Sequence, residues 1–158
     1  MFREMRRANQ ALSREECVRV LTEEKRGVLS LLGDEGWPYG VPLNHYYCPE
    51  DGCLYFHGGL TGHRVDAFRR CDRASFCVYD EGYVKEGSWG KNVRSVIVFG
   101  RLTQVTDKPE AMRLARLLSL KFTRDEEYIR AETEKFGPAT LVLRLTPEHM
   151  TGKLVNES

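Results

Sequence analysis

Two turn signals in the first third of the chain constrain its fold more than any other feature. The segments 33–36 (Gly-Asp-Glu-Gly) and 49–52 (Pro-Glu-Asp-Gly) separate strand-like runs at 27–32, 37–47 and 53–57. Parallel strands need crossover connections of about a dozen residues or more, and these turns are too short for one. Strands joined by tight turns pair antiparallel. The sequence therefore favours an antiparallel sheet over a doubly wound parallel sheet.

The remainder of the chain predicts further strands and several peripheral helices. Strands are expected at 74–79, 93–105 and 139–145. Helices are expected to begin at Arg14, His63, Asp107 and Thr123, the first ending at Gly27 and the second at Cys71. Pro38 and Pro42 cannot donate to a ladder, so the strand at 37–47 is expected at an edge or a bulge. These elements predict one α+β, mainly β domain over 1–158, an antiparallel barrel of six strands with peripheral helices.

Composition and charge give no support to several classes of protein, namely nucleic-acid-binding, membrane-spanning and secreted proteins. The 24 Lys and Arg nearly balance the 23 Asp and Glu, so the net charge of +1 gives no global reason to expect a nucleic-acid partner, and only Arg69, Arg70 and Arg73 form a small local basic patch. No apolar run approaches the ~18 residues of a membrane span, and the N-terminus lacks the apolar core of a secretory signal. Five cysteines, an odd number, favour reduced thiols and hence a cytoplasmic location.

A glycine-rich segment predicts an anion-binding site. From Phe56 to Arg64 the sequence reads FHGGLTGHR, so a strand ends, the backbone turns at glycines, and a helix begins. The free N–H groups of a helix start bind anions, and Arg64 and Thr61 add donors. A cation in the first turn is unfavourable by itself, and an anionic ligand reverses that effect. The alternative is a solvated strand-to-helix loop without a ligand.

Two other segments suit a flat ligand. In the strand at 37–47, Val41 and Leu43 offer contact to a planar ring and Asn44 offers hydrogen bonds. In the strand at 93–105, Arg94 and Ser95 lie at the polar mouth of an apolar run, where they can reach a ligand or solvent. The alternative for both segments is an ordinary strand with one solvated face.

The histidines and cysteines give no sign of a metal centre or a nucleophilic triad. The histidines at 45, 57, 63 and 149 lack the spacing of a ligand set, and no CxxC or HxxxH pair completes a zinc site with Cys48 and Cys53. The chain also lacks Gly-x-Ser-x-Gly. We therefore expect no bound metal.

Short motifs along nearly the whole chain resemble one known superfamily. In chain order they are MRR at 5–7, QALS at 10–13, RGVLS at 26–30, PYGVPLN at 38–44, LYFHG at 54–58, TGHRVDA at 61–67, FCVY at 76–79, RSVIVFGR at 94–101 and HMTGK at 149–153. Their order and spacing resemble the FMN-binding split-barrel superfamily typified by pyridoxamine 5'-phosphate oxidase. Within it the chain looks most like the nitroimidazole-resistance (Nim) group.

This resemblance implies a homodimer that binds FMN at the subunit interface. Val41, Pro42, Leu43 and Asn44 would lie along the isoalloxazine ring, and Ser95 would make a polar contact to it. The phosphate end would be held by the residues of the glycine-rich segment, namely His57, Gly58, Gly62, His63 and Arg64. Arg64 stands where Nim-like relatives often carry Lys, and both can bind phosphate. The chain lacks the C-terminal Trp and Arg of the pyridoxamine oxidases, so vitamin B6 oxidation is not expected.

A protein of this kind is expected to be a flavin-dependent reductase. FMN would take electrons from NAD(P)H, visiting transiently, and pass them to a nitroaromatic such as a 5-nitroimidazole or to another small acceptor. His63 is a candidate proton donor, and its alternative role is to orient the phosphate loop. The rival hypothesis is a protein that stores, senses or sequesters FMN without turnover. A third alternative is another planar cofactor, such as haem or a deazaflavin, in the same barrel.

Overall fold

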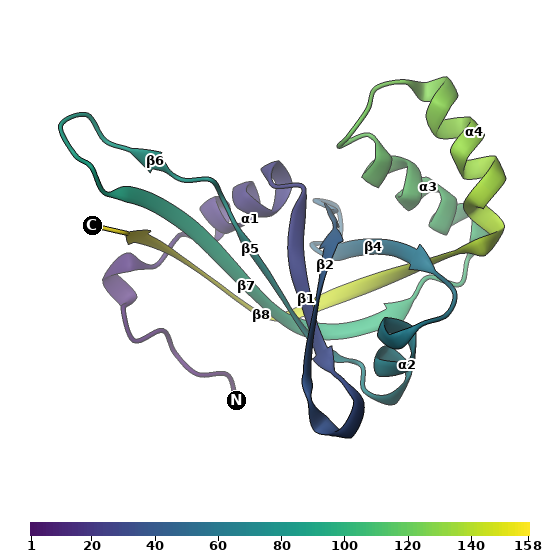
Figure 1. Ribbon diagram of the computed structural model, residues 1–158, viewed down its shortest axis with the longest axis horizontal. Helices are drawn as coiled ribbons and strands as arrows, with labels where there is room; N and C mark the ends of the chain where they lie inside the picture. The colour runs from purple at the N-terminus through teal and green to yellow at the C-terminus, as the bar shows by residue number, and fades with distance from the viewer.

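The computed structural model describes residues 1–158, except for the side chain of Phe136, and contains one antiparallel sheet with helices around it (Figure 1). The strands are β1 (Arg26–Leu32), β2 (Pro38–Asn44), β3 (Tyr46–Tyr47), β4 (Leu54–Gly59), β5 (Arg73–Tyr79), β6 (Tyr83–Val84), β7 (Lys91–Gln104) and β8 (Thr140–Asn156). The α-helices are α1 (Arg14–Glu23), α2 (His63–Arg70), α3 (Lys108–Ser119) and α4 (Glu126–Phe136). Among the described residues, no helix has the length and apolar character needed to cross a membrane.

The strand order forms a sheet whose two ends meet. The order is β2-β1-β5-β7-β8-β4-β3, with β6 paired to β7 outside this path. β2 and β3 therefore lie at opposite ends of the order, yet only His45 separates them in the chain. β2 also contacts β4 although the two strands share no hydrogen-bonded ladder. We call this unpaired junction between β2 and β4 the seam of the barrel.

The inner face of the sheet forms the main core. Along β1, β5 and β7 the buried residues alternate with more exposed ones, so that Leu29, Phe76 and Val98 point inward while Val28 and Ile97 point outward. Helix α1 adds Cys17, Val20 and Leu21 to this core. A second cluster, made of Cys48, Cys53, Tyr55, Leu114 and Val142, lies where α3 packs against β4 and β8.

The fold confirms the antiparallel α+β architecture and corrects the number of strands. The sheet has eight strands instead of six. The expected strand at 37–47 divides at His45 into β2 and β3, and the loop expected at 80–90 contains the two-residue β6. The last strand continues from Leu145 to Asn156, because pairing with the long β7 resumes after a bulge at Phe99 and Gly100.

The edge position of β2 follows from its prolines. Among the described strands, β2 pairs only with β1. Proline has no N–H to donate to a ladder, so Pro38 and Pro42 suit a strand that is paired on one side only. The turn between β1 and β2 has positive φ at Glu35 (53°) and Gly36 (79°), as expected for a tight hairpin connection.

At α1 the side chain of Ser13 accepts from the backbone N–H of Glu16 in a capping box, and this helix ends at Glu23, before the expected end at Gly27.

Candidate functional site

The first turn of α2 presents backbone donors at the end of β4. Gly62 precedes the helix with φ at +121°, a conformation that favours glycine, and a side chain that could cap the helix is absent there. A Cβ on Gly62 would meet no heavy atom within 4 Å, and Thr61, Gly62 and His63 at the start of the helix are all exposed. The first N–H groups of α2 are therefore accessible to an acceptor from outside.

Arg64 is a half-buried cation without a counter-ion. Its Nε is buried and has no hydrogen-bond partner, and no salt bridge to Arg64 occurs among the described residues. The guanidinium lies so close to Gly58 that a Cβ there would overlap it. Burial lowers the pKa of Arg64, although an arginine stays charged at any physiological pH. A charged group in this setting gains from an anionic partner, which would supply the missing acceptor.

His57 lies beside this cation on β4. The surrounding protein and the charge of Arg64 both lower the pKa of the His57 imidazole, while part of its surface stays exposed. A neutral His57 therefore offers one donor and one acceptor next to Arg64 at neutral pH. His57, Gly58, Gly62 and Arg64 form one cluster at the seam, which we call the anion cluster.

His63 belongs to a different set of contacts. Its ring stacks on Tyr39 of β2, with centroids 3.9 Å apart and planes at 19°. Its Nε2 lies 3.7 Å from Oδ2 of Asp34, and the other carboxylate oxygen, Oδ1, accepts a hydrogen bond of 2.5 Å from Arg70. The hydrogen bond from Arg70 is the main cause of the lowered pKa of Asp34. The structure therefore connects His63 to the β1–β2 turn through Tyr39 and Asp34, two residues that the sequence reasoning did not single out.

The residues predicted to line a planar ring lie on both faces of β2. Val41 and Leu43 pack against the main core, whereas Pro42 is exposed and Asn44 follows it on the outer side of the strand. Ser95 on β7 is also on the outer side, and β1 and β5 separate it from β2. One chain therefore brings Asn44 and Ser95 to the same face but not into contact.

This outer face is unusually apolar for a solvent-exposed sheet. Val28, Ile97 and Phe99 are 38%, 38% and 39% exposed, and Leu32 at the end of β1 is 48% exposed. Phe2 stacks on His149 with ring centroids 4.8 Å apart, and its ring centroid lies 5.5 Å from that of Phe99 on the same face. An exposed apolar surface of this kind is typical of an interaction surface.

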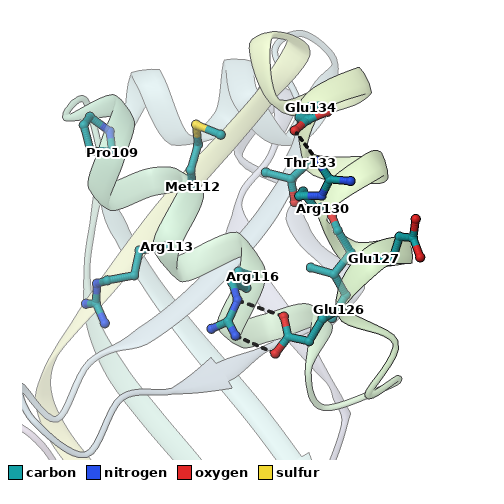
Figure 2. Close-up of a pocket in the computed structure, with 10 residues that line it drawn as sticks. Pro109, Met112, Arg113, Arg116, Glu126, Glu127, Arg130, Thr133 and Glu134 are labelled. Carbon is teal, nitrogen blue, oxygen red and sulfur yellow. Dashed lines mark hydrogen bonds and ion pairs between the residues drawn. The ribbon is translucent and has the colours of Figure 1, made fainter.

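A large cleft lies away from the anion cluster, between α3 and α4 (Figure 2). It has a volume of about 760 Å³, and none of the residues predicted to bind a cofactor lines it. Its arginines pair with neighbouring carboxylates, Arg116 with Glu126 and Arg130 with Glu134, as Figure 2 shows. The cleft thus offers apolar surface with paired charges and is a poor site for an anion.

Comparison with known proteins gives the family. A sequence model of the family described as pyridoxamine 5'-phosphate oxidase matches residues 13–154. No curated protein sequence matches the chain.

Solved structures share the fold. A candidate 5-nitroimidazole antibiotic resistance protein from Bacteroides thetaiotaomicron is 18% identical with a TM-score of 0.77, the match covering 92% of this chain and 87% of that one. An FAD-binding protein from Mesorhizobium loti is 25% identical with a TM-score of 0.64, covering 92% and 97%. An FAD- and haem-binding protein from Mycobacterium smegmatis is 24% identical with a TM-score of 0.74, covering 94% and 74%. With its antiparallel split barrel and a family match over most of its length, the chain belongs to the pyridoxamine 5'-phosphate oxidase family.

Proposed function

We propose that this protein binds FMN at the seam and uses it to reduce a small organic acceptor, such as a nitroaromatic compound, with NAD(P)H as the electron donor. The observation that carries the proposal is the unpartnered guanidinium of Arg64 in the first turn of α2. Flavin binding by proteins of the same fold, such as those of Mesorhizobium loti and Mycobacterium smegmatis, supports a flavin over other anionic ligands.

The described residues fit the phosphate of such a cofactor. Arg64 would bind it through charge-assisted hydrogen bonds, the N–H groups after Gly62 would add donors, and His57 would donate from a neutral ring. The absence of a side chain at Gly58 leaves room for the guanidinium. The ring would lie along 41–44 at the edge of the sheet, with Asn44 as its hydrogen-bonding residue.

When bound, FMN would supply the redox chemistry, by accepting a hydride from a nicotinamide and passing electrons to the acceptor. The protein would position that cofactor and control access to it. The stack with Tyr39 and the approach of Nε2 to Asp34 favour a positioning role for His63, as the residue that holds the start of α2 against β2. A proton-donor role for His63 would require Nδ1 to face the acceptor, since Nε2 faces Asp34.

The same proposal includes a homodimer whose interface is the outer face of the sheet. The exposed apolar residues Val28, Ile97 and Phe99 support it, because a second copy would cover them. Pro42, Asn44 and Ser95 lie on this face, so a partner subunit would enclose the ring end of the site.

The absorption spectrum of the purified protein is the first test. Flavin bands that bleach anaerobically with NADH or NADPH, together with conversion of a nitroimidazole to the amine, are the expected result. Bound flavin that neither nicotinamide reduces would contradict the reductase and leave a flavin-storing or flavin-sensing protein. A haem or deazaflavin spectrum would contradict FMN itself.

Two matched variants test the anion cluster. Arg64→Met removes the proposed phosphate ligand, and Arg69→Met removes an exposed arginine from the same helix. Loss of charge-assisted bonds of about 1.5–3 kcal/mol should weaken FMN binding roughly 10- to 100-fold in the first variant only. Arg64→Lys keeps the charge and should retain most of the affinity. Equal dissociation constants for Arg64→Met and Arg69→Met would place the phosphate elsewhere.

A further inference from the structure

The single residue that joins the two ends of the sheet is held by three separate hydrogen bonds. The ring Nε2 of His45 donates to the carbonyl of Leu21 at 2.7 Å, and the backbone N–H of His45 donates to the carbonyl of Lys25 at 3.3 Å. The carbonyl of His45 accepts a hydrogen bond of 2.8 Å from Nζ of Lys121. His45 is fully buried, so each of these bonds replaces a contact with water that the chain has lost.

Lys121 makes a second bond, which connects the β2–β3 link at His45 to α1. Its Nζ donates to the carbonyl of Glu24 at 2.6 Å, and Glu24 caps the C-terminal end of α1. Carbonyl groups at this end of a helix lack intrahelical partners and attract cations. Lys121 lies just after α3, so one ammonium group joins α1, the α3–α4 connection and the β2–β3 link.

We propose that Lys121 is a positioning residue that fixes the Asn44 end of β2 and thereby shapes the edge where the flavin ring is placed. The inference rests on the proposed function, since the ligand along β2 is the flavin argued above. The geometry that carries it is the pair of bonds from one Nζ to two carbonyls, one of which belongs to the residue next to Asn44. The ladder with β1 holds Asn44 opposite Arg26, and the bond from Lys121 to the carbonyl of His45 adds a second restraint at the next residue.

The electrostatic surroundings give this contact a pH dependence. Burial lowers the pKa of Lys121 to about 8, the Glu24 carboxylate opposes that shift, and Lys25 adds to it. The His45 ring that faces the same junction is neutral at these pH values. A neutral amine keeps two N–H donors and can still reach both carbonyls, but the bonds lose their charge assistance. The β2–β3 link at His45 is therefore expected to loosen as the pH rises through about 8.

The experiment compares FMN binding by Lys121→Met, by Lys121→Gln and by a control, Lys85→Met, which alters an exposed lysine between β6 and β7. Fluorescence titration at pH 7 should show a dissociation constant raised about tenfold in Lys121→Met and unchanged in Lys85→Met. The difference between wild type and Lys121→Met should narrow to roughly threefold at pH 9, because wild-type Lys121 is then mostly neutral. Lys121→Gln keeps a donor without the charge, so its affinity should be intermediate and independent of pH over this range.

Amide hydrogen exchange of the ligand-free protein separates the two proposals. Removal of the ammonium should increase exchange at Tyr46 and at neighbouring amides of the link, whether or not flavin binds. Wild-type protein that binds no FMN would refute the proposed function, and the exchange result would still decide the role of Lys121. FMN affinity and exchange rates equal to those of wild type in Lys121→Met would overturn the positioning role. If Lys121→Met fails to fold, Lys121→Gln decides by the same two measurements.

Discussion

Acidification should destabilise this protein through one buried imidazole. The ring of His45 is fully buried and packs edge-on against Phe76, with centroids 4.9 Å apart. Its Nε2 is committed as a donor to Leu21, and its Nδ1 is buried without a hydrogen-bond partner among the described residues. Protonation would place a second N–H at Nδ1, where no acceptor exists. Burial, with a smaller contribution from the charge of Lys121, lowers the pKa of His45 to about 4.

The direction and size of the effect follow from the difference between folded and unfolded pKa values. The unfolded chain takes up the proton near the ordinary value of 6.5 and the folded chain only near 4. The unfolded state therefore binds more protons between these pH values, so stability from this group is fully present above 6.5 and is lost as the pH falls toward 4. At about 1.36 kcal/mol per pKa unit, the loss is about 2 kcal/mol at pH 5 and about 3 kcal/mol at pH 4.

Urea unfolding of wild type and His45→Gln at pH 7, 6 and 5 measures this term. Glutamine can still donate to the carbonyl of Leu21 but does not replace the imidazole ring that packs against Phe76, so the variant should be less stable than wild type at pH 7. Because glutamine cannot titrate, the variant should lose less stability on acidification. The carboxylates are common to both proteins, and their contribution cancels in the difference between the two pH profiles. The difference in unfolding free energy between wild type and His45→Gln should become smaller by about 2 kcal/mol between pH 7 and pH 5. Parallel profiles over this range would refute the argument.

Three substitutions test other parts of the structure. Gly58→Ala places a Cβ where the Arg64 guanidinium lies, so FMN titration should show affinity reduced about tenfold, and unchanged affinity would contradict the anion cluster. Gly27→Ala brings a Cβ against the Phe76 ring and the Cys77 carbonyl, so urea unfolding should show a loss of about 1–3 kcal/mol, and a neutral result would mean that the core relaxes easily. Ile97→Lys puts a charge on the outer face and should convert a dimer to monomers in sedimentation velocity, whereas an unaltered dimer would place the interface elsewhere.

The parts of the fold that depend on local chemistry could be predicted from the sequence. The hairpin at 33–36, the capping box at Ser13 and the edge position of β2 each follow from residues within a few positions of one another. The helix start at His63 was predicted from the glycines before it, and the structure places it there. These features need no information about distant segments.

The parts that depend on long-range pairing could not be predicted in the same way. The strand expected to end at Leu145 continues to Asn156 because β7 supplies a partner along its whole length, and Pro147 gives no local sign of this. The stack of His63 on Tyr39 joins residues 24 positions apart, and the sequence offers only an aromatic residue in an alternating strand. Arg64 was singled out for its charge, but its lack of a counter-ion is a property of the folded chain.

His45, which the sequence marks only as one of four histidines without metal-ligand spacing, lies where the two ends of the sheet join. The run at 37–47 reads as one strand because apolar and aromatic residues continue through it without a turn signal. The strand order shows instead that the chain leaves one end of the sheet at Asn44 and enters the other end at Tyr46. A one-residue link of this kind requires the two ends to lie side by side, so closure of the barrel and burial of His45 have the same cause. The same requirement places Asn44 beside the seam, and it explains why a buried imidazole and a distant lysine can influence the edge proposed to bind flavin.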